Sequence, residues 1–378
     1  MALKAVHVSD VPNLDQVQEN ATFSLCSTHF SKEVEFNRVA YSIPKFLVIG
    51  HRGHGKNKFQ TTDRRMEAIK ENSIMSFNAA AKYPLDFIEF DVQVTKDGCP
   101  VIFHDDVILS VDNLVKQGTV AEKRVTDLTL SEFLSHGTQR NTSVIGKALF
   151  RKTKDGKIVK WEVEEDDSLC TLQDAFQLVK PSLGFNIELK FDDHTVYHQD
   201  HLIESLHSVL NVVFECANDR PIIFSSFQPD AALLVGKLQN KYPVFFLTDA
   251  GTRLYDDVRR NSLEEAVKVC LQGGLQGIVS HAKGVFANPS SVIKIKDAKL
   301  SLVTYGELNN VAEAVHMQHL MGIDGVIVDF VQEITEVVSD MIFRRTKVED
   351  EEELDPLPKF SQKELSFLLR LIPELIRL

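Results

Sequence analysis

Short apolar runs recur along the chain, and longer stretches with helical spacing separate them. The eight runs occupy residues 46–49, 87–94, 185–189, 222–225, 244–247, 277–279, 300–304 and 325–328. Strands that alternate with helices pair in parallel, and eight parallel strands can close into a barrel. Such a barrel can take most of a 378-residue chain as one domain. The sequence therefore predicts the α/β class and, within it, a (β/α)8 TIM barrel.

A small insertion interrupts this alternation after the second strand. The polar segment of about 106–168 holds an Asp155-Gly156 pair between two β-rich runs. Asp-Gly is a strong signal for a tight turn, so we expect a hairpin there. The same signal at Asp97-Gly98 predicts another hairpin directly after the second strand.

The hairpin of the insertion carries the only tryptophan of the chain, Trp161. Val159 and Val163 stand two residues to either side, so the three side chains should share one face of a strand. An apolar face of this kind is usually part of a core, and we expect it to pack on the barrel wall. The alternative is that it overhangs the mouth of the barrel and limits what the mouth admits.

The two ends of the chain differ from the barrel in character. Residues 1–44 are irregular and are interpreted as an N-terminal extension, and the barrel is expected to span 45–342. Residues 343–378 hold an acidic linker with prolines and then an amphipathic helix, where Ser361 and Glu364 form a capping-box pattern. We expect this helix to dock onto the barrel, with a membrane surface as the alternative.

Three acidic residues interrupt strands that are otherwise apolar. Glu89 and Asp91 stand two residues apart and share a face, and Glu188 lies in the next strand. The C-terminal ends of barrel strands meet at one mouth, where three carboxylates repel one another unless a cation joins them. Oxygen ligands suit a hard divalent ion, with Mg²⁺ expected and Ca²⁺ as the alternative. The simpler interpretation is a set of salt bridges with Lys190 and Arg52.

Two histidines directly follow apolar runs. His51 and His104 should each sit at the C-terminal end of a strand, where barrel enzymes carry their catalytic residues. Histidine titrates near neutral pH, so a pair can serve as general base and general acid. Arg52 and Lys190 can hold the non-bridging oxygens of a phosphate. His54 has no strand-end position, and we assign it no role.

The stretch FLVIGHRGHGKN also matches the start of a nucleotide-binding P-loop, through Gly50, Gly55 and Lys56. That loop needs serine or threonine after the lysine, because the hydroxyl holds Mg²⁺. Asn57 occupies this position, and the polar residues after it lack the apolar stripe of a helix. We therefore reject the nucleotide-binding interpretation.

One resemblance accounts for these features together. The chain resembles glycerophosphodiester phosphodiesterases, most of all the soluble plant type, in the stretches GHRG, KENSIMSFNAAAKYPLDFIEFDVQVTKDGCPVIFHDD, CTLQDAF, FNIELKF, IIFSSF and MGIDGVIVDF. These stretches span about four fifths of the chain. Members of this family are TIM barrels with a small insertion after the second strand, so the resemblance implies the fold inferred above.

The resemblance implies the same roles for the two histidines, the three carboxylates and the two cations, and it adds supporting residues. Glu71 and Asn72 match the family's Glu-Asn pair and would support the first loop. Asn72 is also a good N-cap for the helix that follows. Phe227 would form an apolar wall, and Tyr305 stands where the family often has tryptophan. The family's arginine shortly after its His-Asp pair is absent here, and the insertion is long.

The activity that the resemblance implies is hydrolysis of a glycerophosphodiester. Glycerophosphocholine or glycerophosphoethanolamine would give sn-glycerol 3-phosphate and an alcohol, with a divalent metal and acid–base catalysis by the histidine pair. One alternative is a lysophospholipase D-type or phospholipase-like lyase reaction on lysolipids at the same site. Another is a barrel without catalysis that binds lipid or partner proteins, against which the intact histidines and carboxylates argue.

Composition narrows the partners and the location. A net charge of −12 disfavours the phosphate backbone of nucleic acids, so we expect a small substrate and no nucleic acid partner. No apolar run reaches the roughly 18 residues of a transmembrane segment. Five widely spaced cysteines without a C-x-x-C pattern favour a reducing compartment. An N-terminus without signal-peptide or transit-peptide character favours the cytoplasm, with the plastid as the alternative. The oligomeric state stays open.

Overall fold

The computed structural model describes Tyr41, Ile43 and residues 45–111, 120–153, 155–193 and 195–349. All of the described residues belong to one compact unit. The predicted N-terminal extension therefore lies almost wholly outside the described residues. The predicted C-terminal amphipathic helix lies outside them as well.

Eight strands form a closed parallel barrel. They are β1 (Leu47–Gly50), β2 (Phe87–Val94), β9 (Gly184–Leu189), β10 (Ile222–Ser226), β11 (Val244–Thr248), β12 (Gly277–His281), β13 (Ser301–Tyr305) and β14 (Gly325–Val328). The strand order is β1-β14-β13-β12-β11-β10-β9-β2, and β1 also pairs with β2, which closes the ring. The predicted TIM barrel is confirmed, and each predicted run corresponds to one barrel strand.

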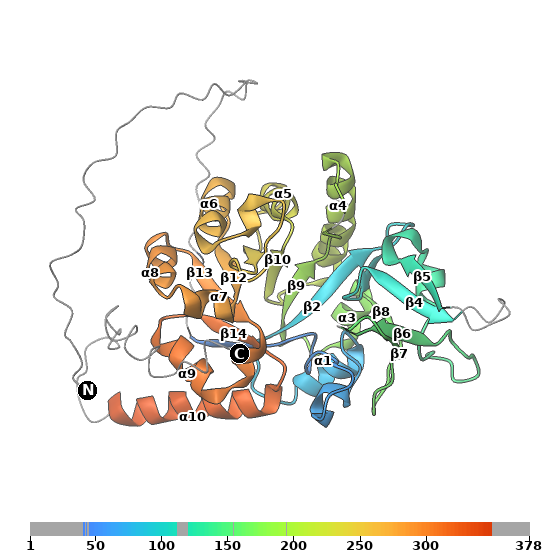
Figure 1. Ribbon diagram of the computed structural model, residues 1–378, viewed down its shortest axis with the longest axis horizontal. Coiled ribbons are helices and arrows are strands. Elements are labelled where there is room, and N and C mark those ends of the chain that lie inside the picture. Colours follow the sequence, from blue (N-terminus) through green and yellow to red (C-terminus); the bar gives the residue numbers. More distant parts are fainter. Residues whose placement is uncertain are drawn as a thin grey trace, which may run out of the picture. The chain divides into compact units, whose positions relative to one another are not determined.

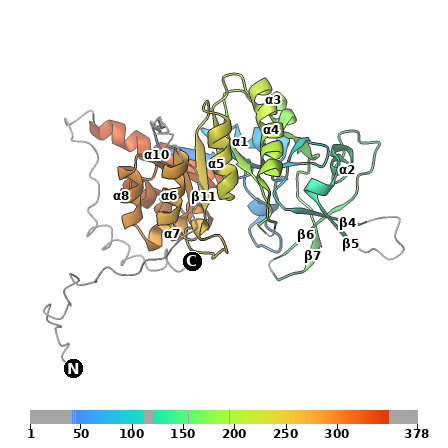
Figure 2. The same cartoon turned by 90° about the horizontal axis from the view of Figure 1, so that it is seen from above.

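Helices surround the ring of strands (Figure 1 and Figure 2). They are α1 (Ile74–Ala80), α3 (Leu172–Leu178), α4 (Gln199–Cys216), α5 (Pro229–Leu238), α6 (Leu263–Gly273), α7 (Ala282–Ala287), α8 (Ser290–Asp297), α9 (Ala312–Leu320) and α10 (Val331–Glu349). Short 3-10 turns add η1 (Arg64–Glu67), η2 (Val125–Asp127), η3 (Val258–Arg260) and η4 (Glu307–Asn310). Helix α10 continues past residue 342, where we expected the barrel to end, and so takes in part of the predicted linker.

The insertion after β2 forms its own antiparallel sheet. Strands β3 (Pro100–Ile102) and β8 (Cys170–Thr171) first extend the barrel sheet beside β2. The second sheet has the order β5-β4-β6-β7, made of β4 (Val107–Val111), β5 (Val120–Arg124), β6 (Leu149–Lys152) and β7 (Ile158–Lys160), with α2 (Leu130–Leu134). Both predicted hairpins are present, because β2 pairs with β3 and β6 pairs with β7 in antiparallel fashion.

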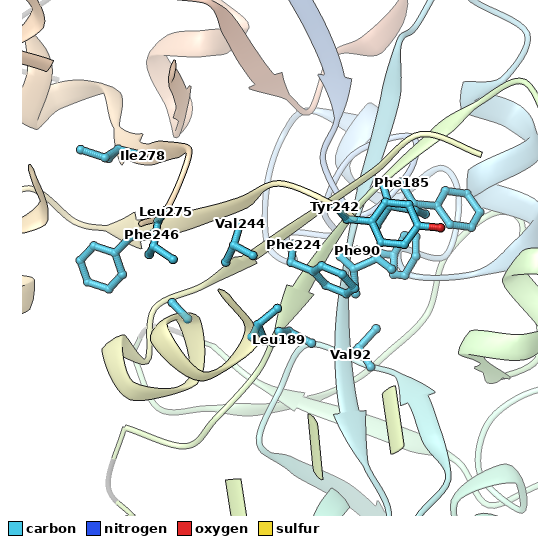
Figure 3. Packing of buried hydrophobic residues seen from close by; sticks show 14 of the residues in the cluster. Phe90, Val92, Phe185, Leu189, Phe224, Tyr242, Val244, Phe246, Leu275 and Ile278 are labelled. Atoms are coloured by element: carbon cyan, nitrogen blue, oxygen red, sulfur yellow. The ribbon is translucent and has the colours of Figure 1, made fainter. Parts of the chain in front are cut away.

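Two-residue alternation along each barrel strand separates two hydrophobic layers. In β2, Ile88, Phe90 and Val92 point outward into the layer between strands and helices, part of which Figure 3 shows. The other parity points into the barrel, where Phe87 joins an inner core. Glu89 and Asp91 have the same parity as Phe87, so they point inward too. The alternation therefore delivers both carboxylates to the interior of the barrel.

Two inward-facing glycines make room for inner-core aromatic rings. A Cβ atom at Gly184 would lie 2.4 Å from the ring of Phe87, and one at Gly277 would lie 2.8 Å from the ring of Phe245. Phe87 and Phe245 belong to the same inner core, which fills the lower part of the barrel. Because this core occupies the lower part of the barrel, the charged inward-facing side chains of the strands lie near the C-terminal mouth.

The insertion has a separate hydrophobic core around Trp161. This core includes Phe103 and Phe133, and Phe59 and Val163 pack against it. The indole of Trp161 is 5% exposed, so the predicted face does cover apolar groups. It covers the interior of the insertion, and Val159 does not take part because β7 ends at Lys160. The expectation that all three side chains pack on the barrel wall was therefore wrong, because Trp161 and Val163 belong to the core of the insertion.

Within the described residues, no helix is long and apolar enough to cross a membrane.

Candidate active site

A cavity of about 560 Å³ opens at the C-terminal end of the barrel strands. Its lining includes most of the site residues that the sequence analysis proposed, namely His51, Arg52, Glu89, His104, Glu188, Lys190, Phe227 and Tyr305. Asp91, Glu71 and Asn72 are buried behind this lining. The structure thus brings all of the proposed residues to one place.

The inward alternation of each barrel strand explains this convergence. Ile49, Val303 and Ile327 are inner-core residues of three strands, and two residues further along stand His51, Tyr305 and Asp329. The same step from the inward residues of the other strands leads to Asp91, Lys190, Phe227, Asp249 and His281. A barrel strand directs alternate side chains inward, so the first inward side chain above the core faces the cavity.

His51 follows β1 and is held by a carboxylate that follows β14. Its Nδ1 lies 2.7 Å from Asp329 Oδ1. Burial alone would raise the pKa of Asp329, but the charges of His51 and Lys56 hold it well below the usual range. Asn310 donates to the other carboxylate oxygen over 2.9 Å, which fixes the orientation of Asp329. With Nδ1 bound to Asp329, Nε2 of His51 is the ring nitrogen available to the cavity.

His104 has a similar partner. Its Nδ1 lies 2.7 Å from Oδ1 of the adjacent Asp105, so Nε2 is again the free ring nitrogen. Burial and the positive charges of Arg52 and Lys190 lower the pKa of His104 to about 4. This shift favours the neutral form of His104. Each of the two histidines thus has one nitrogen fixed by a carboxylate and one nitrogen for chemistry.

Three carboxylates form a compact buried cluster between the histidines. One oxygen from each of Glu89, Asp91 and Glu188 lies within 4.8 Å of the others. Burial and mutual repulsion raise the pKa of Glu89, and burial followed by the charge of Asp91 raises that of Glu188 to about 7 despite the opposing charge of Lys190. Oε1 of Glu89 is buried without a hydrogen-bond partner. A bound cation would relieve the repulsion, and this oxygen could coordinate it, so the donor set fits a divalent metal.

The two proposed phosphate contacts stand on either side of this cluster. Nζ of Lys190 lies 3.4 Å from Glu188 and 3.9 Å from Asp91. Nε of Arg52 lies 3.5 Å from Asp91, yet it makes no hydrogen bond. The backbone of Arg52 has a positive φ of 50°, which turns its amide onto Glu89 Oε2 over 2.9 Å. Both cations face the cavity, where they can meet an anion.

The loop after β1 is organised by Glu71. This carboxylate accepts hydrogen bonds from the amide of Asn57 and from Arg52, the latter over 2.8 Å. Burial opposes its ionisation, but Arg151 and Arg52 lower its pKa to about 2. The side chain of Asn57 donates to the carbonyl of Ile69 over 2.8 Å. Asn57, the residue that conflicts with a P-loop, therefore joins the first loop to the segment before α1.

Asn72 does not cap the following helix as we expected. Ser73 is the N-cap of α1, and its hydroxyl accepts from the amide of Ser76. Asn72 adopts a left-handed backbone with φ of 54°, a conformation that asparagine tolerates better than most residues. Its amide group donates to Asp91 over 2.8 Å instead. The N-cap prediction was wrong because this side chain is used to orient a carboxylate of the cluster.

The wall opposite the first loop combines aromatic rings and a carboxylate. The rings of Phe227 and Tyr305 meet edge to face, with centroids 6.0 Å apart. The hydroxyl of Tyr305 donates to Asp249 over 2.5 Å, and the hydroxyl of Tyr255 also binds Asp249. The guanidinium of Arg260 stacks on Tyr255 at 3.5 Å from the ring centroid. This wall suits the part of a substrate that carries carbon and hydroxyl groups.

The site residues that were not predicted from the sequence include Asp105, Arg151, Asp249, His281 and Asp329. Three of them, Asp249, His281 and Asp329, stand two residues beyond an inner-core residue of a barrel strand and were detectable by extending the inward parity. Asp105 directly follows His104, so its position in the sequence also made it detectable. Arg151 gave no such signal, because it comes from the insertion, outside the barrel repeat.

The geometry of the first loop makes a direct prediction about nucleotides. Lys56 lies 3.7 Å from Asp329, and the chain after Asn57 runs into the 3-10 turn η1 instead of an α-helix N-terminus. A P-loop needs that helix end to bind phosphate. We expect Mg-ATP to leave the melting temperature unchanged and to remain unhydrolysed. A thermal shift with Mg-ATP that disappears in Lys56→Ala would contradict this expectation.

Comparison with known proteins gives consistent results. The glycerophosphoryl diester phosphodiesterase family matches residues 51–333. An Arabidopsis thaliana protein named glycerophosphodiester phosphodiesterase GDPD1, chloroplastic, is 61% identical over the full length of both chains. A glycerophosphocholine phosphodiesterase of Candida albicans is 32% identical over 76% of this chain and 28% of its own length.

Solved structures agree on the fold. A putative glycerophosphoryl diester phosphodiesterase from Silicibacter pomeroyi superimposes with a TM-score of 0.59 at 22% identity, covering 79% of this chain and 95% of that one. An Oleispira antarctica phosphodiesterase, solved in complex with the product sn-glycerol-3-phosphate, gives a TM-score of 0.54 at 19% identity and covers 78% of this chain and 96% of its own.

Proposed function

The chain belongs to the glycerophosphoryl diester phosphodiesterase family and is a glycerophosphodiester phosphodiesterase, and from that premise we propose how its own residues carry out the hydrolysis. The substrate is a small glycerophosphodiester such as glycerophosphocholine or glycerophosphoethanolamine, and the products are sn-glycerol 3-phosphate and an alcohol. One observation carries this proposal above the others. Two carboxylate-held histidines, His51 and His104, line the same cavity as a cluster of three buried carboxylates.

Glu89, Asp91 and Glu188 are the proposed ligands of a divalent cation, with Mg²⁺ favoured because all donors are hard oxygens. When bound, this cation supplies positive charge that stabilises the negative charge developing on the phosphorus oxygens. The unpartnered Oε1 of Glu89 supports this role, since buried polar oxygens otherwise have partners.

Arg52 and Lys190 are proposed to hold the non-bridging oxygens of the phosphodiester. Both line the cavity and lie within 4 Å of Asp91. Nε of Arg52 is a donor without a partner, so a phosphate oxygen would satisfy it. Charge-assisted contacts of this kind orient the phosphorus between the two histidines and become stronger as charge builds up in the transition state.

The histidines are proposed to move the protons. Nε2 of one histidine accepts the proton of the attacking hydroxyl, and Nε2 of the other donates a proton to the leaving alcohol as the P–O bond breaks. Asp329 and Asp105 keep each Nδ1–H directed away from the cavity, which fixes the tautomer that the chemistry needs. The attacking group is proposed to be the glycerol 2-hydroxyl of the substrate, which gives a cyclic phosphate that water then opens.

One assay separates this function from its alternatives. Purified protein is incubated with glycerophosphocholine or with lysophosphatidylcholine, with and without EDTA. Released choline is measured for both substrates, and released glycerol 3-phosphate is measured for glycerophosphocholine. Metal-dependent release from glycerophosphocholine supports the proposal, and ³¹P NMR during turnover would detect the cyclic phosphate. Products from the lysolipid alone would support the lysophospholipase D-type or lyase alternative. No product from either substrate would leave only a lipid- or partner-binding barrel.

The location of the protein is part of the proposal as well. The sequence favours the cytoplasm, whereas the plastid alternative gains support from the Arabidopsis thaliana relative named chloroplastic, at 61% identity. Imaging the full chain fused at its C-terminus to a fluorescent protein decides between the two compartments, because a C-terminal fusion leaves the N-terminal residues free to act as a targeting signal.

A further inference from the structure

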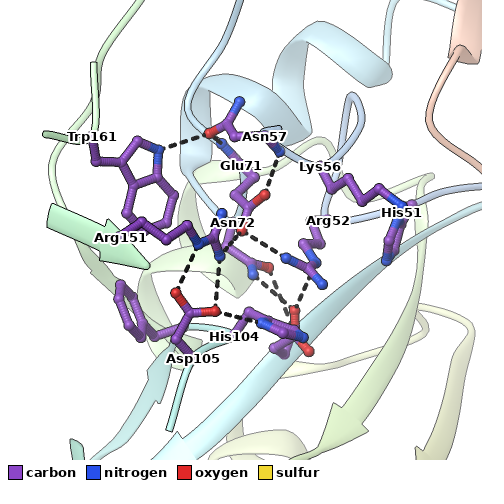
Figure 4. Close-up of polar contacts among 12 residues, drawn as sticks. His51, Arg52, Lys56, Asn57, Glu71, Asn72, His104, Asp105, Arg151 and Trp161 are labelled. Carbon is purple, nitrogen blue, oxygen red and sulfur yellow. Dashed lines mark hydrogen bonds and ion pairs between the residues drawn. The ribbon is translucent and has the colours of Figure 1, made fainter. Parts of the chain in front are cut away.

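An arginine of the insertion, Arg151, binds two carboxylates at the active site, Asp105 and Glu71. Arg151 lies on β6, about half of the chain away from the last barrel strand, and its side chain is 12% exposed. Its Nε and one terminal nitrogen donate to the two oxygens of Asp105 over 2.7 and 3.0 Å. The same terminal nitrogen also donates to Glu71 over 2.7 Å. Through this side chain the insertion contacts two carboxylates of the site (Figure 4).

The two carboxylates that Arg151 binds each control another residue. Asp105 holds Nδ1 of His104 at 2.7 Å. Glu71 holds the guanidinium of Arg52 through the same oxygen that accepts from Arg151. Arg151 is thus one residue removed from a proposed proton-transfer group and from a proposed phosphate contact.

Trp161 links Arg151 to Asn57 and thus closes a ring of contacts that leads back to Glu71. The guanidinium of Arg151 stacks on the indole at 4.1 Å from the ring centroid. The indole Nε1 donates to Asn57 Oδ1 over 3.0 Å, and Asn57 in turn donates its backbone amide to Glu71. Stacking restricts the planar guanidinium to one orientation, and a bidentate contact needs that orientation. The insertion therefore presents Arg151 in a fixed position.

Arg151 supplies positive charge to both carboxylates that it binds. Glu71 is fully buried at its side chain, and Asp105 is about a quarter exposed. Burial opposes the ionisation of both, and the positive charge of Arg151, more than any other neighbouring charge, lowers the pKa of each carboxyl below its usual range. Without this cation, Asp105 would keep His104 as its close partner, and Glu71 would keep Arg52 and the amide of Asn57. The orientation of His104 would then no longer be coupled to that of Arg52.

We propose that Arg151, stacked on Trp161, is a positioning residue that aligns His104 through Asp105 and Arg52 through Glu71. The insertion is accordingly part of the catalytic apparatus and has more than a structural role. This inference rests on the proposed function, because the histidine and the arginine matter only if they act on a phosphodiester.

A double-mutant cycle tests the positioning role in the full-length chain with Mg²⁺. Arg151→Ala should lower kcat for glycerophosphocholine by about 10–100-fold, the usual scale for a residue that orients a catalytic ligand. In a His104→Ala background, the same substitution should lower kcat by a smaller factor, because His104 is already gone and only the alignment of Arg52 remains to be lost. Equal losses in both backgrounds would overturn the alignment of His104 by Arg151, and a normal kcat in Arg151→Ala would overturn the inference outright.

Two further variants separate positioning from folding. Arg151→Lys keeps the charge but loses the bidentate fork, so kcat should lie between those of wild type and Arg151→Ala. Lys152→Ala changes the neighbouring exposed residue on β6 and should leave kcat and the melting temperature unchanged. A loss of kcat in Lys152→Ala equal to that in Arg151→Ala would contradict the proposed role, because it would show that any change in β6 has this effect.

The sole tryptophan gives a readout that needs no turnover. Titration with sn-glycerol 3-phosphate should change the emission of Trp161, because a phosphate that engages Arg52 disturbs Glu71 and Asn57. Arg151→Lys should weaken this binding about tenfold, and Lys152→Ala should not. Equal affinities in wild type and Arg151→Lys would overturn the coupling to Arg52. If the wild-type chain bound the phosphate with this coupling yet hydrolysed no glycerophosphodiester, the proposed function would fail on its own.

Discussion

Replacing His51 or His104 with alanine is expected to lower kcat for glycerophosphocholine by about 10²-fold or more in each case, the usual scale for the loss of a general acid or base. Each ring has its Nδ1 fixed by a carboxylate, Asp329 or Asp105, and presents Nε2 to the cavity. Alanine removes the only nitrogen that can exchange a proton with the substrate at that position. Steady-state kinetics with purified variants measures the effect.

The fold should tolerate these substitutions, because both side chains line a solvent-filled cavity and neither belongs to a hydrophobic core. His207→Ala is a matched control, since His207 is exposed on α4 and does not line the cavity. Near-normal turnover in His51→Ala or His104→Ala would show that this histidine is structural. A similar loss in His207→Ala would point to a general effect of removing histidine.

Removal of the divalent metal is expected to abolish activity, and adding Mg²⁺ should restore it. Three carboxylates whose oxygens lie within 4.8 Å of one another carry charge that the surrounding residues compensate only in part. Chelation with EDTA followed by dialysis should bring turnover to background, and the melting temperature should rise on adding the metal back. Full activity after dialysis against EDTA would reject a metal-dependent mechanism.

The same cluster predicts an unusual pH dependence for the metal-free protein. The pKa of Glu188 rises from 4.5 to about 7 on folding, chiefly through burial. The native state therefore binds more protons than the unfolded state between these values, so stability should fall as pH rises from about 4.5 to about 7. Glu188→Gln should remove this part of the pH dependence and raise the melting temperature of the metal-free protein at pH 8. Thermal melts in EDTA at several pH values measure both effects.

The sequence predicted the barrel well because the barrel is a repeated local pattern. Each strand needs only a short apolar run with a helical stretch after it, and both signals lie within a few tens of residues. The carboxylates Glu89 and Asp91 were found for the same reason, since charged residues on a buried strand stand out. Residues that gave such local signals were brought together by the structure.

The parts that escaped prediction depend on contacts between distant segments. Nothing around Arg151 indicates that β6 directs it toward Asp105 and Glu71, 46 and 80 residues away in the chain. The predicted packing partner of Trp161 was wrong because the insertion forms its own core with Phe103 and Phe133, which strand periodicity alone does not reveal. Asn72 was misplaced because its amide group has a tertiary partner, Asp91, which replaces the local capping role.

The contact between His51 and Asp329 joins residues 278 positions apart, across the seam where β1 meets β14. The entropy lost on closing a loop grows with its length, and folds dominated by such distant pairs form slowly. During synthesis β1 emerges first among the barrel strands and β14 last, so His51, a proposed catalytic residue, can contact Asp329 only after almost the whole barrel has been made. In refolding experiments, the fluorescence of Trp161 should therefore recover with the insertion, and enzymatic turnover should return only in a later phase, when the seam closes.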